Sequence, residues 1–387
     1  MEKAKRASIW LLPVILLSYF VVGFPDGSFT VSWLGIAYDI PGMTTAHTGW
    51  ILVGYSVTYT LAGVILSWVN RFLKLQTIYF WGLIIMGLGF IGLALSPNFA
   101  AVVAFISLYG FGTGAMASSM NSYMAKHFTA RHNNWMHFFW GAGAAISPII
   151  MGQSMLAHSW RTGYFVITAV LGLVAVMLFI SMYKKVWIDD AAATLEADAV
   201  KKSKKFLTKK WHQNVQVLTF FFLGGTDYTL VFFTGAALIA RGYYNVTIFS
   251  AVYYLFMTLG RMVTGWVARW LKEVSIIRIS VLVSVTGIGV LYFTSSVIGM
   301  AVVGFGLGPL LPTLVSDTSN CFKPNILPKI VGYELAAFGA GIAVLFFITS
   351  QILHFISYEA LFYLGLSFIV LVFVCNEVLE KAHSKVS

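Results

Sequence analysis

Charged residues are scarce in this 387-residue chain, where Asp, Glu, Lys and Arg together make up only 10%. A soluble domain carries about 25% charged residues, so this scarcity excludes a protein whose surface is covered by water-facing side chains. The two cysteines, Cys321 and Cys375, stand in no CxxC spacing, which excludes a disulfide framework and a zinc site. The sequence also lacks a phosphate-binding loop, a metal-ligand cluster and a Ser/His/Asp arrangement, so we predict no enzyme, no metal and no cofactor.

Apolar residues are abundant: they form 59% of the chain, and the mean hydropathy is +0.83. Apolar runs long enough to cross a hydrocarbon core of about 30 Å recur along almost the whole length. The sequence therefore predicts an all-α membrane protein with twelve transmembrane helices in two six-helix bundles. The expected spans are 8–36, 46–69, 76–96, 100–125, 133–156, 160–183, 212–240, 246–270, 275–294, 297–320, 328–354 and 357–379.

Basic residues indicate the orientation of these spans. The net charge of +11 comes from lysines and arginines in alternate loops, whereas the opposite face holds only Arg161 and Arg241. By the positive-inside rule both termini are expected in the cytoplasm, and nucleic acid is not an expected partner. We expect an integral protein of a bacterial cytoplasmic membrane that acts as a monomer.

A basic segment divides the chain. The predicted organisation is an N-terminal bundle over 1–183, a cytoplasmic linker over 184–211 that touches lipid headgroups, and a C-terminal bundle over 212–387. The two halves also resemble one another, because Arg71/Arg269, Gly141/Gly339 and Gln153/Gln351 are each 198 residues apart. Duplicated halves that enclose a central cavity are typical of carriers that work by alternating access.

The loop after the second span carries a family resemblance. Its sequence, Leu66-Ser67-Trp68-Val69-Asn70-Arg71-Phe72-Leu73-Lys74, resembles the signature of the major facilitator superfamily. In that superfamily the position of Asn70 is usually aspartate and that of Leu73 is usually glycine. Asn70 has no charge, so the resemblance does not carry over the inward-gate salt bridge that the family normally builds there.

A narrower resemblance lies in the first 150 residues. Gly23-Phe24-Pro25-Asp26-Gly27, the segment from Gly112 to Asn121, and the segment from Asn133 to Pro148 resemble the fucose permease and glucose/mannose symporter branch. That resemblance implies import of a sugar together with protons, using acids in spans 1 and 4. The chain departs from the branch at Ala117, where those symporters have a carboxylate.

Two acids lie deep in apolar spans. Asp26 lies near the middle of span 1, where an ionised carboxylate costs at least ~2.5 kcal/mol, and Asp227 with the adjacent Tyr228 lies at a similar depth in span 7. Asp26 is a candidate for substrate binding and proton coupling, and Asp227 and Tyr228 for the cavity lining. The alternative is that both acids are structural and accept bonds from helix backbone that glycine and proline loosen.

Other candidates for the substrate path are polar or aromatic. Asn121 and His137 offer hydrogen bonds to hydroxyl groups or, alternatively, join spans 4 and 5. Tyr55 and Tyr59 share a helix face, and Trp140 lies three residues after His137. Arg261, deep in span 8, needs an anion, and Asp317 and Glu334 are the candidates for a gating ion pair.

The leading hypothesis is a secondary transporter of a small polar metabolite, a sugar or sugar derivative, that couples to protons through Asp26 or acts as a facilitator. One alternative is a proton-driven efflux antiporter for drugs or other amphipathic compounds. Another, from a different class, is a channel or lipid scramblase. The expected partners are the small-molecule substrate, protons and membrane lipid.

Overall fold

The computed structural model describes residues 2–70, 72–128, 130–187, 207, 209–323 and 326–384, and within these ranges the regular elements are helices. Residues group into two compact units, Met1–Met43 with Gly54–Asp198, and Thr44–Val53 with Ala199–Ser387. Most of the predicted linker, the side chains of residues 66–68, 133 and 134, and Arg71 fall outside the description.

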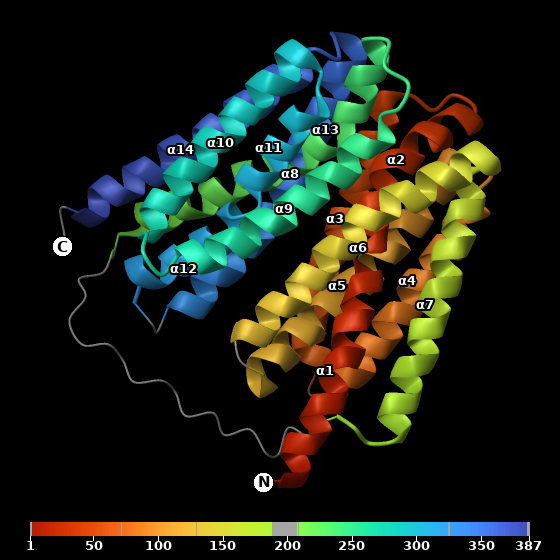
Figure 1. Cartoon of the computed structure of the whole chain (residues 1–387), viewed down its shortest axis with the longest axis vertical. Coiled ribbons are helices and arrows are strands. Elements are labelled where there is room, and N and C mark those ends of the chain that lie inside the picture. The colour runs from red at the N-terminus through yellow and green to blue at the C-terminus, as the bar shows by residue number, and fades with distance from the viewer. Residues whose placement is uncertain are drawn as a thin grey trace. The chain divides into compact units, whose positions relative to one another are not determined.

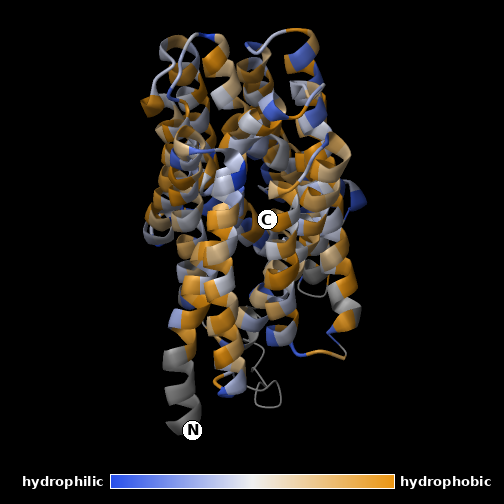
Figure 2. Ribbon diagram, turned by 90° about the vertical axis from the view of Figure 1, so that its right-hand side faces the viewer, coloured by the Kyte–Doolittle hydropathy of each residue, from blue (hydrophilic) through white to orange (hydrophobic). Residues whose placement is uncertain are grey.

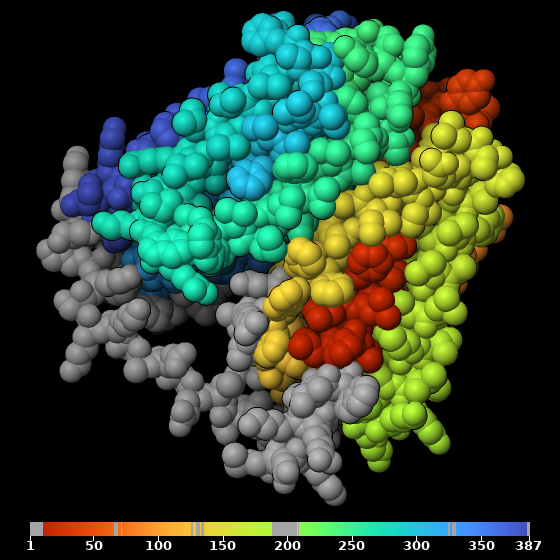
Figure 3. Space-filling model, in the orientation of Figure 1, coloured from red at the N-terminus to blue at the C-terminus, as the bar shows by residue number. Residues whose placement is uncertain are grey.

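Unit 1 holds the first helices of the chain, coloured red to yellow-green in Figure 1. Its space-filling surface shows the red α1 between the yellow α6 and the yellow-green α7 (Figure 3). The helices are α1 (Glu2–Val22), α2 (Phe24–Asp39), α3 (Thr45–Val69, whose first residues belong to unit 2), α4 (Leu75–Ala94), α5 (Phe99–His127), α6 (Ala130–Ala157) and α7 (Trp160–Tyr183).

Unit 2 holds the later helices. Its helix α8 packs against both α13 and α14, and α11 packs against α9 and α10. The helices are α8 (Lys210–Ala240), α9 (Thr247–Val267), α10 (Glu273–Thr294), α11 (Val297–Leu307), α12 (Leu310–Cys321), α13 (Leu327–Phe355) and α14 (Ala360–Ser384).

The prediction of an all-α membrane protein is confirmed. Among the described residues, eleven helical segments are long and apolar enough to cross a membrane, and α6 supplies a further 28-residue helix at the remaining expected span. Hydrophobic residues run along the helices, whereas hydrophilic ones gather in the connections (Figure 2). Side-chain caps start three of the described helices: Asn98 accepts from the Ala101 amide at 3.0 Å, Ser159 from the Thr162 amide at 3.3 Å, and Ser296 from the Ile298 amide at 3.1 Å.

Two expected spans are each broken into a pair of helices. Span 1 breaks at Gly23, just before Pro25, and span 10 breaks at Gly308 and Pro309. Proline lacks an amide hydrogen and clashes with the preceding turn, so the helix cannot continue unchanged through either site. The breaks therefore leave backbone carbonyls that need donors from elsewhere.

The internal repeat is visible as a pair of identical helix crossings. A β-carbon on Gly143 would lie 1.7 Å from the Phe20 carbonyl oxygen, and one on Gly341 would lie 1.8 Å from that of Phe221. Gly143 and Gly341 are 198 residues apart, the spacing of the sequence matches. Only glycine permits this approach, so the same close contact of first and fifth spans is built in each unit.

Candidate functional site

Asp26 is positioned by a close contact between α2 and α6. Gly23 and Gly27 lie one helical turn apart, and β-carbons there would lie 2.0 Å from the carbonyl oxygens of Trp140 and Ala144 respectively. Pro148 has no amide hydrogen to offer the Ala144 carbonyl, so that oxygen faces α2 instead. The glycines thus bring the two backbones together and fix the depth of Asp26 between them.

The Asp26 carboxylate accepts hydrogen bonds from two aromatic side chains. Trp140 Nε1 of α6 donates to Asp26 Oδ2 at 3.1 Å, and the Tyr109 hydroxyl of α5 donates to Oδ1 at 3.3 Å. The carboxylate is half-buried, whereas the Tyr109 side chain is buried. Both donors are neutral groups, so they orient the carboxylate without forming an ion pair.

Tyrosine rings extend this site along α3. The Tyr55 ring lies 5.0 Å from that of Tyr109 and 5.9 Å from that of Tyr59, measured between centroids. Tyr59 also interacts electrostatically with Asp26. We call Asp26, Tyr55, Tyr59, Tyr109 and Trp140 the aspartate–aromatic cluster. It combines flat rings with a hydrogen-bonding acid in one place.

Tyr19, which the sequence analysis did not single out, connects His137 to this cluster. The His137 ring meets the Tyr19 ring edge-on at 6.1 Å, and Tyr19 in turn interacts electrostatically with Tyr59. Asn121, by contrast, is exposed and donates to the Ala117 carbonyl of its own helix at 2.8 Å. The structure therefore brings His137, but not Asn121, toward the other predicted residues.

Unit 2 has an acid, Asp227, at the position that corresponds to Asp26, but its neighbours differ. Asp227 lies 201 residues after Asp26, and Gly224 lies 201 residues after Gly23. A β-carbon on Gly224 would lie 2.2 Å from the Phe338 carbonyl oxygen, and one on Gly23 would lie 2.0 Å from that of Trp140. The Tyr253 hydroxyl donates to Asp227 Oδ1, and the Arg261 guanidinium interacts electrostatically with Asp227 and with Tyr228. This acid therefore has a cation beside it.

Arg261 also donates a hydrogen bond to a backbone carbonyl that the break between α11 and α12 leaves without a donor. Its Nε donates to the Gly308 carbonyl at 3.0 Å. In a continuous helix that carbonyl would accept from the amide of residue 312, but Pro312 has none. A buried carbonyl without a donor costs free energy, so the guanidinium replaces the missing hydrogen bond.

The structure gives Asp317 and Glu334, the expected partners of Arg261, contacts of their own. Asp317 accepts from Cys321 Sγ at 3.7 Å, and Glu334 interacts with the Thr318 hydroxyl at 2.6 Å. Arg261 itself donates to the Gly308 carbonyl and interacts electrostatically with Asp227, so an ion pair with Asp317 or Glu334 stays a prediction. The position of Arg261 deep in an apolar span predicted that it needs an anion. That position could not show which helix face carries the arginine.

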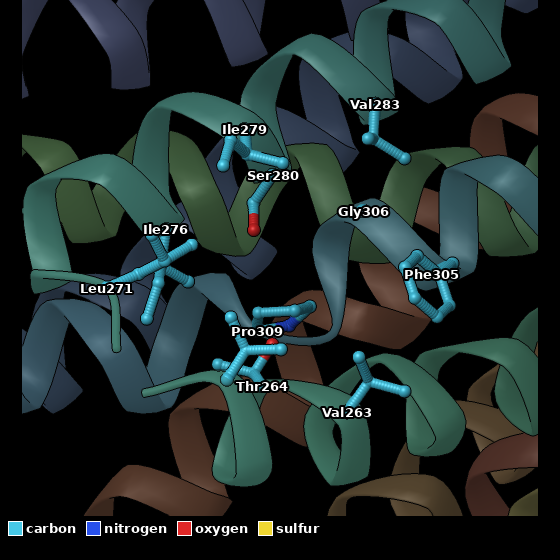
Figure 4. Close-up of a pocket in the computed structure, with 11 residues that line it drawn as sticks. Val263, Thr264, Leu271, Ile276, Ile279, Ser280, Val283, Phe305, Gly306 and Pro309 are labelled. Carbon is cyan, nitrogen blue, oxygen red and sulfur yellow. The ribbon is translucent and has the colours of Figure 1, made fainter. Parts of the chain in front are cut away.

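A separate cavity of about 130 Å³ lies among α9, α10 and the α11–α12 break (Figure 4). It contains none of the predicted site residues. Its lining is apolar except for the hydroxyls of Ser280 and Thr264, so it suits a hydrocarbon chain better than a polar solute. The lining residues are Val263, Thr264, Val267, Leu271, Ile276, Ile279, Ser280, Val283, Phe305, Gly306 and Pro309.

The prediction missed three tyrosines. Tyr109 and Tyr253 donate to the two acids, and Tyr19 contacts His137. One signal was present in the sequence, because Tyr253 lies 198 residues after the predicted Tyr55 and so occupies the same place in the repeat. No comparable signal marked Tyr109 among 18 tyrosines.

Solved structures share this fold. The chain is similar to a crystal structure of a point variant of the nucleoside transporter NupG, with a TM-score of 0.72, 13% identity, and coverage of 93% of this chain and 98% of that one. It is similar to a variant of the peptide transporter POT, with a TM-score of 0.75, 14% identity, and coverage of 97% and 95%. A POT family transporter in complex with a thioalcohol-conjugated peptide gives 0.74, 13%, and 94% of each chain.

No curated protein matches the sequence. The sequence model of the Major Facilitator Superfamily, however, matches residues 15–333, which is most of the chain. This match agrees with the duplicated six-span units and with the apolar helices described above. The chain belongs to the major facilitator superfamily: it is an integral membrane secondary transporter of a small molecule, and it is not an enzyme.

Proposed function

We propose that this transporter carries a sugar or sugar derivative by alternating access, with the aspartate–aromatic cluster as part of its binding site. The observation that supports this proposal is the Asp26 carboxylate held by Trp140 and Tyr109 beside the rings of Tyr55 and Tyr59. A carboxylate accepts hydrogen bonds from sugar hydroxyls, and aromatic faces pack against the C–H faces of a sugar ring. The sequence resemblance to the fucose permease branch supports the same class.

Nucleosides belong in the same test. A nucleoside presents a ribose and a flat base, and both would find partners among these rings and the acid. The similarity in fold to the nucleoside transporter NupG supports their inclusion, and that to peptide transporters supports the inclusion of peptides. Thermal-shift measurements on the purified protein should therefore cover monosaccharides, sugar acids, nucleosides, short peptides and cationic drugs, because a bound ligand raises the melting temperature.

We further propose that Asp26 binds the coupling proton. The test compares uptake into proteoliposomes, with and without an inward proton gradient, for wild type and Asp26→Asn. We expect the gradient to drive accumulation in the wild type only. Asp39→Asn is a matched control, because Asp39 lies on the same helix and also accepts from a tryptophan, Trp160 Nε1, at 2.7 Å. Asp39→Asn should retain gradient-driven uptake.

Two results would contradict the proposal. Gradient-independent uptake in the wild type, unchanged in Asp26→Asn, would remove proton coupling and leave a facilitator. Stabilisation by cationic amphipathic drugs alone would favour efflux, since rings around an acid also attract cations.

We also propose that both termini face the cytoplasm. The support is the concentration of lysine and arginine in alternate connections. Single cysteines introduced after residue 380 should be labelled by impermeant reagents only in inverted vesicles, in a background without Cys321 and Cys375.

A further inference from the structure

Glu334 is a completely buried acid in unit 2. Its exposed fraction is 0%, and it lies near the start of α13. Two buried polar side chains surround it, Thr318 of α12 and Gln216 of α8. The proposed transport site in unit 1 makes no use of this group.

The hydrogen bonds around Thr318 indicate where a proton resides. Its hydroxyl oxygen lies 2.6 Å from Glu334 Oε1, 2.9 Å from the Leu314 carbonyl oxygen and 2.8 Å from Gln216 Nε2. A hydroxyl can donate once and accept twice. The Gln216 amide donates to it, and the Leu314 carbonyl can only accept from it. All three contacts become hydrogen bonds if Glu334 carries a proton and donates it to Thr318.

An ionised Glu334 would fit less well. The Leu314 carbonyl and the carboxylate would then compete for the single hydroxyl proton. Among the described residues, Glu334 Oε2 has no hydrogen-bond partner, although the Gln216 amide lies close to the carboxyl group. A buried charge with one oxygen unsolvated is costly, whereas a neutral acid needs fewer partners.

Other titratable groups lie at the same end of unit 2 as Glu334. Asp317 of α12 interacts electrostatically with it as a like charge, and Asp317 itself interacts with Glu273 of α10 and Glu380 of α14. Other titratable groups at this end of the unit include His383 of α14, 3.8 Å from Cys321 Sγ, and His212, one turn before Gln216 on α8. Cations lie here too: Arg278, which is paired with Glu377, and Lys209, Lys323 and Lys381. The protonation of Glu334 is therefore inferred from the hydrogen bonds of Thr318.

We propose that Glu334 is a proton-binding site of unit 2, which holds its proton in this conformation and releases it to water when this end of the unit is hydrated. The O–H bond of the carboxyl breaks on release, and the proton passes to a water molecule. This site is independent of Asp26 and of the identity of the substrate.

Infrared spectroscopy of the purified full-length protein tests the protonation directly. The carbonyl band of a neutral carboxylic acid should be present in the wild type at neutral pH and absent in Glu334→Gln. Glu377→Gln is the matched control, because Glu377 lies at the same end and is ion-paired with Arg278 at 2.7 Å. It should retain the band. A band unchanged by Glu334→Gln would overturn the proposal.

Thermal melting provides a second readout. Glutamine imitates the neutral acid, so wild type and Glu334→Gln should melt alike at low pH. A proton bound more tightly in the folded state stabilises below the unfolded pKa, and this stabilisation is lost as pH rises. Between about pH 5 and pH 9 the wild type should lose at least about 2 °C relative to Glu334→Gln. Parallel curves would contradict the proposal.

A folding failure of Glu334→Gln would not prevent the test. The infrared band can be assigned by elimination with Asp26→Asn, Asp227→Asn and Asp317→Asn, each of which should retain it. Loss of the whole band in any one of these variants would assign the proton to that residue and overturn the proposal for Glu334.

Discussion

At the scale of the residue, Arg261 has two roles in unit 2. It is the cation beside Asp227, and it donates to the Gly308 carbonyl at the break between α11 and α12. Both roles concern groups that are costly to leave without a partner in a buried environment. The sequence identified the need for an anion near Arg261, but the need for a donor at Gly308 becomes clear only when Pro312 is placed opposite that carbonyl.

Replacing Arg261 should therefore destabilise the protein strongly. Arg261→Gln removes the charge beside Asp227 and the Nε donor to Gly308, and we expect a loss of about 3–5 kcal/mol in the free energy of unfolding. The double variant Arg261→Gln/Asp227→Asn should recover part of this loss, since it removes the buried anion as well. Denaturant unfolding measures both, and strictly additive effects of the two substitutions would contradict the pairing.

A second arginine gives a prediction about pH. Arg241 donates from Nε and a terminal nitrogen to Glu359 at 2.6 and 2.5 Å, and these hydrogen bonds hold the pKa of Glu359 below its ordinary value. A lowered folded-state pKa stabilises the fold above the unfolded pKa, and this contribution is lost as pH falls through the folded-state value.

The expected effect is small, because Glu359 is 43% exposed and solvent screens the pair. Glu359→Gln should lower the melting temperature at neutral pH by the equivalent of about 1 kcal/mol or less. The two melting curves should converge in acid, as the pH falls through the lowered pKa of Glu359 in the folded wild type. A constant difference down to acid pH would show that the charge of Glu359 does not contribute.

At the scale of the element, the twelve spans follow from long apolar runs, but the helix breaks do not. The sequence around Gly23 and around Gly308 is a continuous apolar run, and proline is the one local sign that the helix is interrupted. Proline within a membrane helix can kink it or end it, depending on which outside group serves the freed carbonyl. That donor is a tertiary contact, such as Arg261 to Gly308, which no local pattern encodes.

The duplicated glycine crossings give a prediction for helix packing. Gly341→Ala places a β-carbon 1.8 Å from the Phe221 carbonyl, so α8 and α13 must separate and the protein should lose about 1–3 kcal/mol or more. Gly172→Ala on α7 is the control, because no atom lies within 4 Å of the added carbon. The control should be neutral or stabilising by up to about 1 kcal/mol, as alanine favours helix. Equal melting temperatures of the two variants would contradict the close packing.

At the scale of the whole molecule, duplication kept the backbone crossings and changed the side chains around the two acids. Trp140 of unit 1 corresponds to Phe338 of unit 2, 198 residues later, and only the tryptophan can donate to an acid. The sequence predicted Asp26 and Trp140 as separate candidates for the substrate path. Their hydrogen bond depends on the approach of α2 and α6, which sequence spacing alone could not define.

This difference can be tested by making unit 1 more like unit 2. Trp140→Phe removes one donor to Asp26 while keeping an aromatic ring, so the fold should persist. We expect the affinity for the transported ligand to fall by up to about tenfold, because the Asp26 carboxylate loses a donor that orients it. The reciprocal variant Phe338→Trp should leave affinity unchanged. A ligand titration by thermal shift distinguishes them, and equal affinities of Trp140→Phe and wild type would exclude Trp140 from the site.

The helix break beside Arg261 has a consequence for how such a chain can evolve. A mutation of Pro312 to alanine would restore an amide that can reach the Gly308 carbonyl, and a mutation of Asp227 to asparagine would remove the anion. Loss of the arginine should be tolerated only in lineages that have already made these changes. The order of substitutions at three distant positions is thus constrained by one proline that has no hydrogen on its nitrogen.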